Sequence, residues 1–220
     1  MTQNFGDFPS TLATNNVVAI FLLLSFMLTF VSTAHLRRFL ARQTYNFLYR
    51  PSSDKIFGLT KGEQHYQLFL LFMTCVFLAL TAALLTGIVQ TSDLLLLTAI
   101  TVGVMAVKLV LHIFVGHTFF NKGEYRLWKP SLIYINAAEG ILLMPVVLTQ
   151  IYHGLPLKFF VAYVVLIVVA VRLATLVKSW NTLLGGRKNP AFFLLYFWAA
   201  EVTPLLVLVA IVAAGVGYEP

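Results

Sequence analysis

Six long apolar segments occupy most of this 220-residue chain and leave little room for any other kind of fold. They lie at 15–35, 64–90, 93–118, 130–152, 156–178 and 190–216. Each approaches or exceeds the roughly 20 apolar residues that an α-helix needs to cross the hydrocarbon core of a bilayer. Only 10% of the residues are charged, whereas a soluble domain carries about a quarter. We therefore expect an all-α, polytopic six-helix transmembrane bundle.

The apolar segments favour helices over a membrane barrel, because their hydrophobic runs are continuous and do not alternate with polar residues. The first fourteen residues are polar, contain no Lys or Arg, and precede a full-length apolar segment, so no cleavable signal peptide is apparent. The single cysteine, Cys75, gives no information about compartment. We expect one membrane domain over 1–220 with an outside tail at 1–14.

The connections divide this domain into three predicted hairpins. The first is at 15–90 and contains a long basic loop at 36–62, and the other two are at 93–152 and 156–216. The turn between the fourth and fifth segments is tight, since only His153, Gly154 and Leu155 separate them.

Lys and Arg residues gather in three of the connections, all on one side of the predicted membrane. These twelve cations are Arg37, Arg38, Arg42, Arg50, Lys55, Lys61, Lys122, Arg126, Lys129, Lys178, Arg187 and Lys188, whereas the other side has only Lys158. Because Lys and Arg collect on the cytoplasmic side, we expect a bacterial inner-membrane protein with both termini periplasmic. The cations flank membrane helices and form no separate basic domain, so a nucleic acid is not an expected partner.

Two phrases 62 residues apart are nearly the same. The first reads LIYINAAE at 132–139 and the second LLYFWAAE at 194–201. AVKL at 106–109 likewise resembles AVRL at 170–173, and Pro130 and Pro190 open the fourth and sixth segments. Two matched phrases in the same order favour duplication. We expect helices three and four, and helices five and six, to be a tandem parallel hairpin repeat.

Two of these stretches also resemble a known family. GILLMP at 140–145 and LYFWAAEVTPLL at 195–206 are similar to a bacterial membrane family of Bacteroidota, domain of unknown function 4271. The resemblance extends from about residue 30 onward. It implies an inner-membrane protein of several helices, and it supplies no activity, cofactor or catalytic residue.

Four ionisable residues lie inside the apolar segments at similar predicted depth: Lys108, Glu139, Arg172 and Glu201. An unpaired charge there costs about 2.5–3.5 kcal/mol, so we expect pairing or hydration. His112 lies one turn after Lys108 on the same helix face and joins this predicted intramembrane polar cluster.

Two interpretations of the cluster compete. In the first, Lys108–Glu139 and Arg172–Glu201 are ion pairs that fix helix register, one within each copy of the repeat. In the second, the two glutamates face a shared cavity and bind protons, cations or a basic group, while Lys108 and Arg172 tune their protonation.

Four histidines, His35, His65, His112 and His117, should lie in the inner half of the membrane and are weak candidates for binding haem or a metal. No H-E-x-x-H pattern, paired spacing or Cys partner supports them, so we predict no cofactor and no metal site. Ser and Thr residues occur in the predicted helices, but none of them lies in a G-x-S-x-G or S-x-x-K setting, and we predict no catalytic residue.

The leading functional hypothesis is an inner-membrane accessory or scaffold protein, and we do not expect an enzyme. The alternative is a small transporter or proton- or cation-conducting protein that uses Glu139 and Glu201. A second alternative is a haem- or quinone-associated membrane protein. The bilayer is the expected partner, and the basic loop at 36–62 or the small residues around Gly215 offer surfaces for a protein partner or a second copy.

Overall fold

A computed structural model describes residues 16–35, 61–87, 91–119, 122–183 and 197–216, together with the single positions 37 and 41. Every regular element in this part of the chain is helical, which confirms the predicted all-α fold. The helices are α2 (Asn16–His35), α4 (Lys61–Thr86), α5 (Thr91–Phe119), α6 (Lys122–His153) and α7 (Leu157–Leu183), followed by the π-helical turn η2 (Trp198–Val202) and α9 (Thr203–Val216). The predicted tail at 1–14, most of the basic loop at 36–62 and the predicted helix start at Pro190 lie outside the described residues.

Four of these helices are long and apolar enough to cross a membrane. Their apolar stretches are His65–Thr86, Ser92–Val115, Trp128–His153 and Leu157–Trp180. In α2 and in the η2–α9 helix the described apolar stretches are shorter, Leu22–His35 and Trp198–Ala210. This composition is that of a membrane protein.

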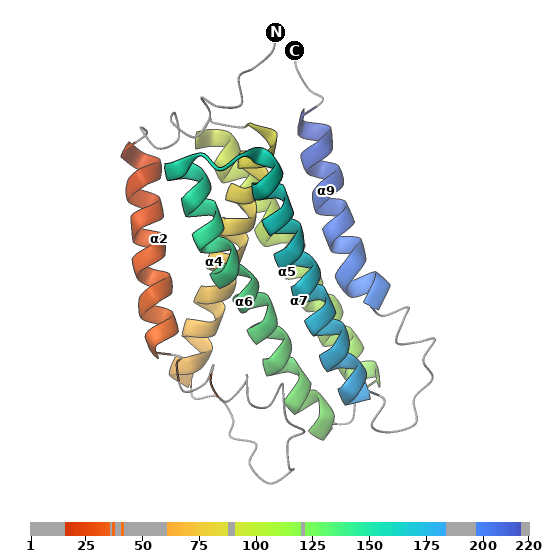
Figure 1. Cartoon of the computed structure of the whole chain (residues 1–220). Coiled ribbons are helices and arrows are strands. Elements are labelled where there is room, and N and C mark those ends of the chain that lie inside the picture. The colour runs from red at the N-terminus through yellow and green to blue at the C-terminus, as the bar shows by residue number, and fades with distance from the viewer. Residues whose placement is uncertain are drawn as a thin grey trace.

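Helices α4 and α6 form the centre of the bundle and pack closely on each other. Around this pair, α2 and α5 pack on α4, α7 packs on α6, and α9 packs mainly on α5 (Figure 1). The helices run roughly along one common direction, as in a bundle that crosses a membrane. Helix α7 therefore packs on the helix before it in the chain, whereas α9 packs on α5, far away in sequence.

Glycines in the left-handed conformation end two of the helices. Gly87, with φ 75°, follows α4, and Gly154, with φ 59°, follows α6. The backbone N–H of Gly154 donates to the carbonyl of Gln150 over 3.1 Å, which is the hydrogen bond of an αL helix cap. Since L side chains rarely adopt this conformation, glycine suits both positions. The predicted tight turn between α6 and α7 is present.

Two predicted helix boundaries were wrong. Helix α6 begins at Lys122 rather than at 130, so Pro130 lies inside the helix and does not open it. Helix α4 ends at Thr86 rather than at 90, because the left-handed Gly87 stops it. A proline inside a membrane helix is tolerated where neighbouring groups satisfy the freed carbonyl. The assumption that proline marks a helix start failed for this reason.

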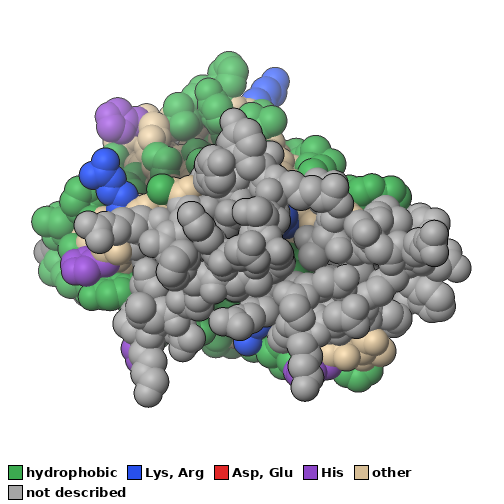
Figure 2. Space-filling model, turned by 90° about the horizontal axis from the view of Figure 1, so that it is seen from below, with side chains coloured by type: hydrophobic (Ala, Val, Ile, Leu, Met, Phe, Trp, Pro, Cys, Tyr) green, Lys and Arg blue, Asp and Glu red, His purple; other side chains and the backbone are tan. Residues whose placement is uncertain are grey.

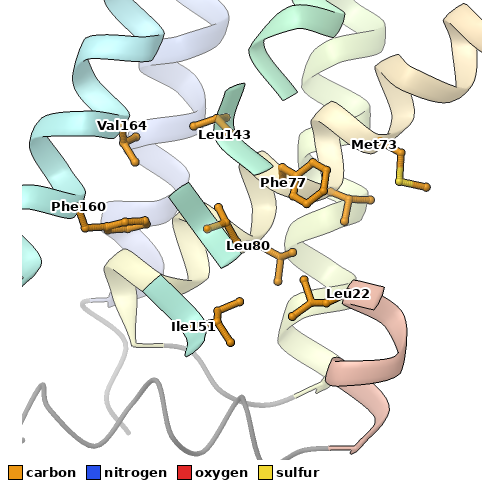
Figure 3. Packing of buried hydrophobic residues seen from close by; sticks show 10 residues of the cluster. Leu22, Met73, Phe77, Leu80, Leu143, Ile151, Phe160 and Val164 are labelled. Atoms are coloured by element: carbon orange, nitrogen blue, oxygen red, sulfur yellow. The ribbon is translucent and has the colours of Figure 1, made fainter. Parts of the chain in front are cut away.

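The largest apolar core lies toward the turn that joins α6 and α7. It contains buried residues of α2, α4, α6 and α7, namely Leu22, Met73, Val76, Phe77, Leu80, Leu143, Val147, Ile151, Phe160 and Val164 (Figure 3). Every side chain of this group is apolar. We call it the apolar core.

The central helices α4 and α6 come unusually close at Gly140. A Cβ atom on Gly140 would lie 2.7 Å from the Cα atom of Thr74, so only glycine fits there. The Thr74 hydroxyl donates to the backbone carbonyl of Asn136 on α6 over 3.2 Å. Small residues allow two membrane helices to approach in this way.

Cationic residues lie at one end of the bundle, the lower end in Figure 1. At this end α4 and α6 begin and α5 and α7 end, and the helix-terminal cations are Lys61, Lys122, Arg126, Lys129 and Lys178. Viewed from that end, Figure 2 shows Lys, Arg and His side chains among hydrophobic ones around its edge. The opposite end carries Asp93 and Lys158. We call the lower end the basic end.

Candidate functional site: a buried ion cluster

The five ionisable residues of the predicted polar cluster lie together in the middle of the bundle. Four are almost fully buried, with Glu139 0%, Glu201 1%, Lys108 4% and His112 4% exposed. The Arg172 side chain is 15% exposed. They come from α5, α6, α7 and η2, so the cluster joins four elements. We call Lys108, His112, Glu139, Arg172 and Glu201 the ion cluster.

Glu201 is the centre of the ion cluster and binds three cationic or potentially cationic groups. Its Oε2 atom lies 2.8 Å from Lys108 Nζ and 2.7 Å from Arg172 Nη1. Its Oε1 atom lies 3.0 Å from His112 Nε2. These are lengths of charge-assisted hydrogen bonds. Both oxygens of Glu201 are therefore paired.

Glu139 binds only Arg172 among the groups of the ion cluster. Arg172 Nη2 donates to both of its oxygens, over 3.0 and 3.1 Å. The guanidinium of Arg172 thus connects the two glutamates, with one terminal nitrogen on each. A planar group with several donors in fixed directions suits this bridging position.

Asn136 on α6 holds the Lys108 amine. Lys108 Nζ donates to Asn136 Oδ1 over 2.7 Å, and Asn136 Nδ2 donates to the carbonyl of Leu132 over 2.8 Å. Asn136 is 0% exposed. Because the carbonyl of the same residue accepts the Thr74 hydroxyl, the close crossing of α4 and α6 fixes the partner of Lys108.

The ion pairs differ from those predicted. Lys108 makes its ion pair with Glu201 and not with Glu139, and Arg172 pairs with Glu139 as well as with Glu201. The predicted pair Lys108–Glu139 was therefore wrong. The reason is the packing, since α7 packs on α6 and the η2–α9 helix packs on α5. Each base reaches the glutamate of the other predicted copy.

A π-helical turn places Glu201 in the bundle. The backbone N–H of Thr203 donates to the carbonyl of Trp198, five residues earlier, and the Thr203 hydroxyl donates to the same oxygen over 3.0 Å. Pro204 follows and has no N–H, and its ring crowds the carbonyl four residues before it. A widened turn relieves this conflict. Single π-turns in α-helices occur frequently at functional sites.

The ring of Trp128 packs against the ring of His112. The two rings stack with centroids 5.6 Å apart and an interplanar angle of 19°. Trp128 Nε1 donates to the Ser179 hydroxyl on α7 over 3.1 Å. Trp128 is 1% and Ser179 0% exposed. Leu132, Ala200 and partly buried residues of α5 and α7 complete this layer.

The formal charges of Lys108, Arg172, Glu139 and Glu201 cancel, so the charge state of the ion cluster depends on His112. A carboxylate only accepts hydrogen bonds, so the His112 Nε2 facing Glu201 carries a hydrogen in either state of the ring. Gain or loss of a proton therefore occurs at Nδ1. Uptake of one proton changes the charge of the whole group from zero to plus one.

The other predicted histidines do not join the ion cluster. His35, at the end of α2, stacks on Tyr66 with ring centroids 5.0 Å apart and lies 2.9 Å from the carbonyl of Val31. His65 and His117 are exposed near the basic end. Among the residues that the structure describes, no group of three or more His, Cys, Asp or Glu side chains could hold a metal ion.

Sequence reasoning missed Asn136, Trp128 and Ser179. A signal was available for Asn136, since it lies in the repeated phrase three residues before Glu139, on the same helix face. Trp128 and Ser179 reach the ion cluster through contacts between helices. Nothing in the sequence pattern indicates those contacts.

A family model described as domain of unknown function (DUF4271) matches residues 18–212. The match includes the whole ion cluster and covers most of the chain, which confirms the resemblance noted from the sequence. No curated protein and no solved structure with which the chain was compared matches it.

Proposed function

Since the chain belongs to the family described as domain of unknown function 4271, which assigns no activity, we propose its function from the geometry of the ion cluster. The protein is a small proton-conducting or proton-coupled membrane protein in which His112 and Glu201 exchange the proton. Chains of acidic residues and histidine inside membrane proteins are typical of proton relays.

The hydrogen bond between His112 Nε2 and Glu201 Oε1 carries this proposal. Uptake of a proton at Nδ1 of His112 allows the Nε2 proton to pass to Glu201 Oε1, which leaves neutral imidazole and a carboxylic acid. Neutral Glu201 holds Lys108 and Arg172 less strongly, because their bonds to it lose the ionic contribution. Proton transfer is thereby coupled to the contacts that join α5, α7 and η2.

A scaffold role is the second candidate, and the complete pairing of both glutamates supports it. Every carboxylate oxygen of the ion cluster accepts at least one hydrogen bond from a cationic group or His112. Buried ion pairs add little stability compared with apolar side chains, and their best-attested structural role is to select one arrangement. In this case the ion cluster fixes helix register and transfers no proton.

The variant His112→Gln separates the two candidates. Glutamine can still donate to Glu201, and the remaining four charges still cancel, so we expect the variant to fold. In vesicles with an internal pH dye and an imposed membrane potential, wild-type protein should carry protons inward. His112→Gln should reduce this flux to the leak of protein-free vesicles.

His117→Gln is the matched control, because His117 lies five residues later on the same helix and is exposed. It should conduct protons like the wild type. Wild-type vesicles that leak no faster than empty ones would reject conduction and leave the scaffold role.

We further propose an inner-membrane location with the basic end in the cytoplasm and both termini in the periplasm. The cations at the basic end support this orientation. A cysteine-free background needs only Cys75→Ser. Lys158 and Lys129 are both exposed. In this background, the Lys158→Cys variant should react with an impermeant thiol reagent in cells with a permeabilised outer membrane, and the Lys129→Cys variant should not. The reverse labelling would contradict the orientation.

A further inference from the structure

We infer that the ammonium group of Lys108 occupies the position of a monovalent cation inside the ion cluster, and that it thereby restricts exchange at this site to protons. The side chains that define the position are those of Asn136 and Glu201. The inference rests on the proposed proton exchange between His112 and Glu201 and adds its ion selectivity. The contacts that define the cation position do not depend on that exchange.

Two oxygen atoms from different helices bind the Lys108 amine. Nζ of Lys108 lies 2.7 Å from Oδ1 of Asn136 on α6 and 2.8 Å from Oε2 of Glu201 on η2. Carboxylate and carbonyl oxygens are also the ligands that hard metal cations prefer. Because an ammonium group and a K⁺ ion have similar radii, the two oxygens lie at distances that suit a K⁺-sized ion.

The amide of Asn136 is held with its oxygen toward this position. Its Nδ2 atom donates to the carbonyl of Leu132 over 2.8 Å, which leaves Oδ1 to accept from a cation. This hydrogen bond lies within α6 and does not involve Lys108, so removal of the lysine leaves the oxygen in place. Asn136 is 0% and Lys108 4% exposed, so the position is buried in the bundle.

The charge balance of the ion cluster calls for one positive charge at this position. With His112 neutral, Lys108 and Arg172 balance Glu139 and Glu201. Loss of the Lys108 ammonium leaves one net negative charge among buried side chains, and an uncompensated buried charge is costly. A monovalent cation restores neutrality, whereas a divalent cation leaves one positive charge in excess.

In the natural protein this positive charge cannot leave. Lys108 is part of α5, so its ammonium stays beside Glu201 and repels a second cation from the same oxygens. A proton differs from a metal cation, because it passes along a hydrogen bond and needs no vacant coordination position. Lys108 is therefore the specificity-determining residue, and proton flux through the wild type should not depend on Na⁺ or K⁺.

Removal of the ammonium tests the cation position directly. In Lys108→Ala the long side chain is absent, so a free cation with water molecules can occupy its volume. Thermal unfolding of the purified variant in detergent, followed by loss of helical circular dichroism, is measured in the chloride salts of Li⁺, Na⁺, K⁺ and choline at equal ionic strength. Choline is the control, because it is too large to bind between the two oxygens.

The melting temperature of Lys108→Ala should rise with K⁺ concentration, by roughly 5–10 °C at about 100 times the dissociation constant. K⁺ should act more strongly than Li⁺, and choline should have no effect. Lower pH should weaken the K⁺ effect, because a proton taken up by Glu201 or His112 restores the same neutral charge. The wild type should melt at one temperature in all four salts, since Lys108 fills the position.

Two further variants complete the test. Lys108→Ala/Asn136→Leu has the same formal charge as Lys108→Ala but lacks one of the two oxygens, so it should lose the K⁺ dependence. Lys108→Ser adds a hydroxyl oxygen beside the position and should respond to K⁺ at least as strongly as Lys108→Ala. It is the variant to measure if Lys108→Ala is not recovered as folded protein.

Equal melting temperatures in K⁺ and choline for both Lys108→Ala and Lys108→Ser, or failure of both to fold in every salt, would overturn the cation position. A K⁺ effect retained without Asn136, or a wild-type proton flux that changes with K⁺, would also overturn the inference. These results leave proton exchange intact. Conversely, a K⁺-stabilised Lys108→Ala together with a wild type that carries no protons in vesicles would overturn the proposed function and retain the cation position.

Discussion

Replacement of Arg172 by leucine should lower the free energy of unfolding by roughly 3–5 kcal/mol, the usual loss when one partner of a buried ion pair is removed. Arg172 supplies every cationic hydrogen bond that Glu139 receives and one of those to Glu201. Without it, Glu139 is a buried carboxylate with no cationic partner in the ion cluster. Denaturant unfolding in detergent, followed by loss of helical circular dichroism, measures the change.

Two double variants test which glutamate belongs to which base. Arg172→Leu/Glu139→Leu leaves Lys108, His112 and Glu201 in contact, so it should regain most of the lost stability. Arg172→Leu/Glu201→Leu has the same formal charge but leaves Lys108 and Glu139, which make no ion pair, so it should stay destabilised. The opposite order of the two double variants would show that pairing within each predicted hairpin is correct.

Substitution of Gly140 should have the second large effect, because a side chain there forces α4 and α6 apart. The Cβ atom of alanine would lie 2.7 Å from the Thr74 Cα atom, and backbone cannot yield as a flexible side chain can. Gly140→Ala should lower the free energy of unfolding by about 1–3 kcal/mol. Gly140→Leu should prevent the two helices from packing, measured as loss of monodisperse protein after purification.

Gly103 provides the matched control for Gly140. It also lies within a membrane helix, α5, but a Cβ atom there would meet nothing within 4 Å. Gly103→Ala should leave stability unchanged or raise it by up to about 1 kcal/mol, since alanine favours the helix. Equal losses for Gly103→Ala and Gly140→Ala would contradict a specific role for the close crossing.

The membership of the ion cluster was predictable because charged residues in apolar segments are rare and need partners. Lys108, Glu139, Arg172 and Glu201 stand out in this sequence for that reason, and helical spacing added His112. Their pairing was not predictable from the same information. It depends on which helices pack together, and the apolar faces of α5, α6, α7 and α9 carry no pattern that distinguishes one neighbour from another.

The helices were predictable from apolar length, whereas details set by single residues were not. The π-turn at Glu201 arises from a conflict between Pro204 and the preceding turn. Pro145, six residues after Glu139, lies within α6 with no such turn.

The tandem repeat stays a prediction. At the position equivalent to buried Asn136, the second phrase has Trp198, which is 60% exposed.

The crossed pairing has a consequence for synthesis, because the chain emerges from the ribosome in sequence order. Glu139 and Arg172 can meet once α7 has entered the membrane. Lys108 and His112 are synthesised earlier, yet the carboxylate that they share lies in η2, 89 residues after His112. Until η2 has been synthesised, neither side chain can contact Glu201. The formal charges of the ion cluster therefore cancel only once η2 has joined the bundle.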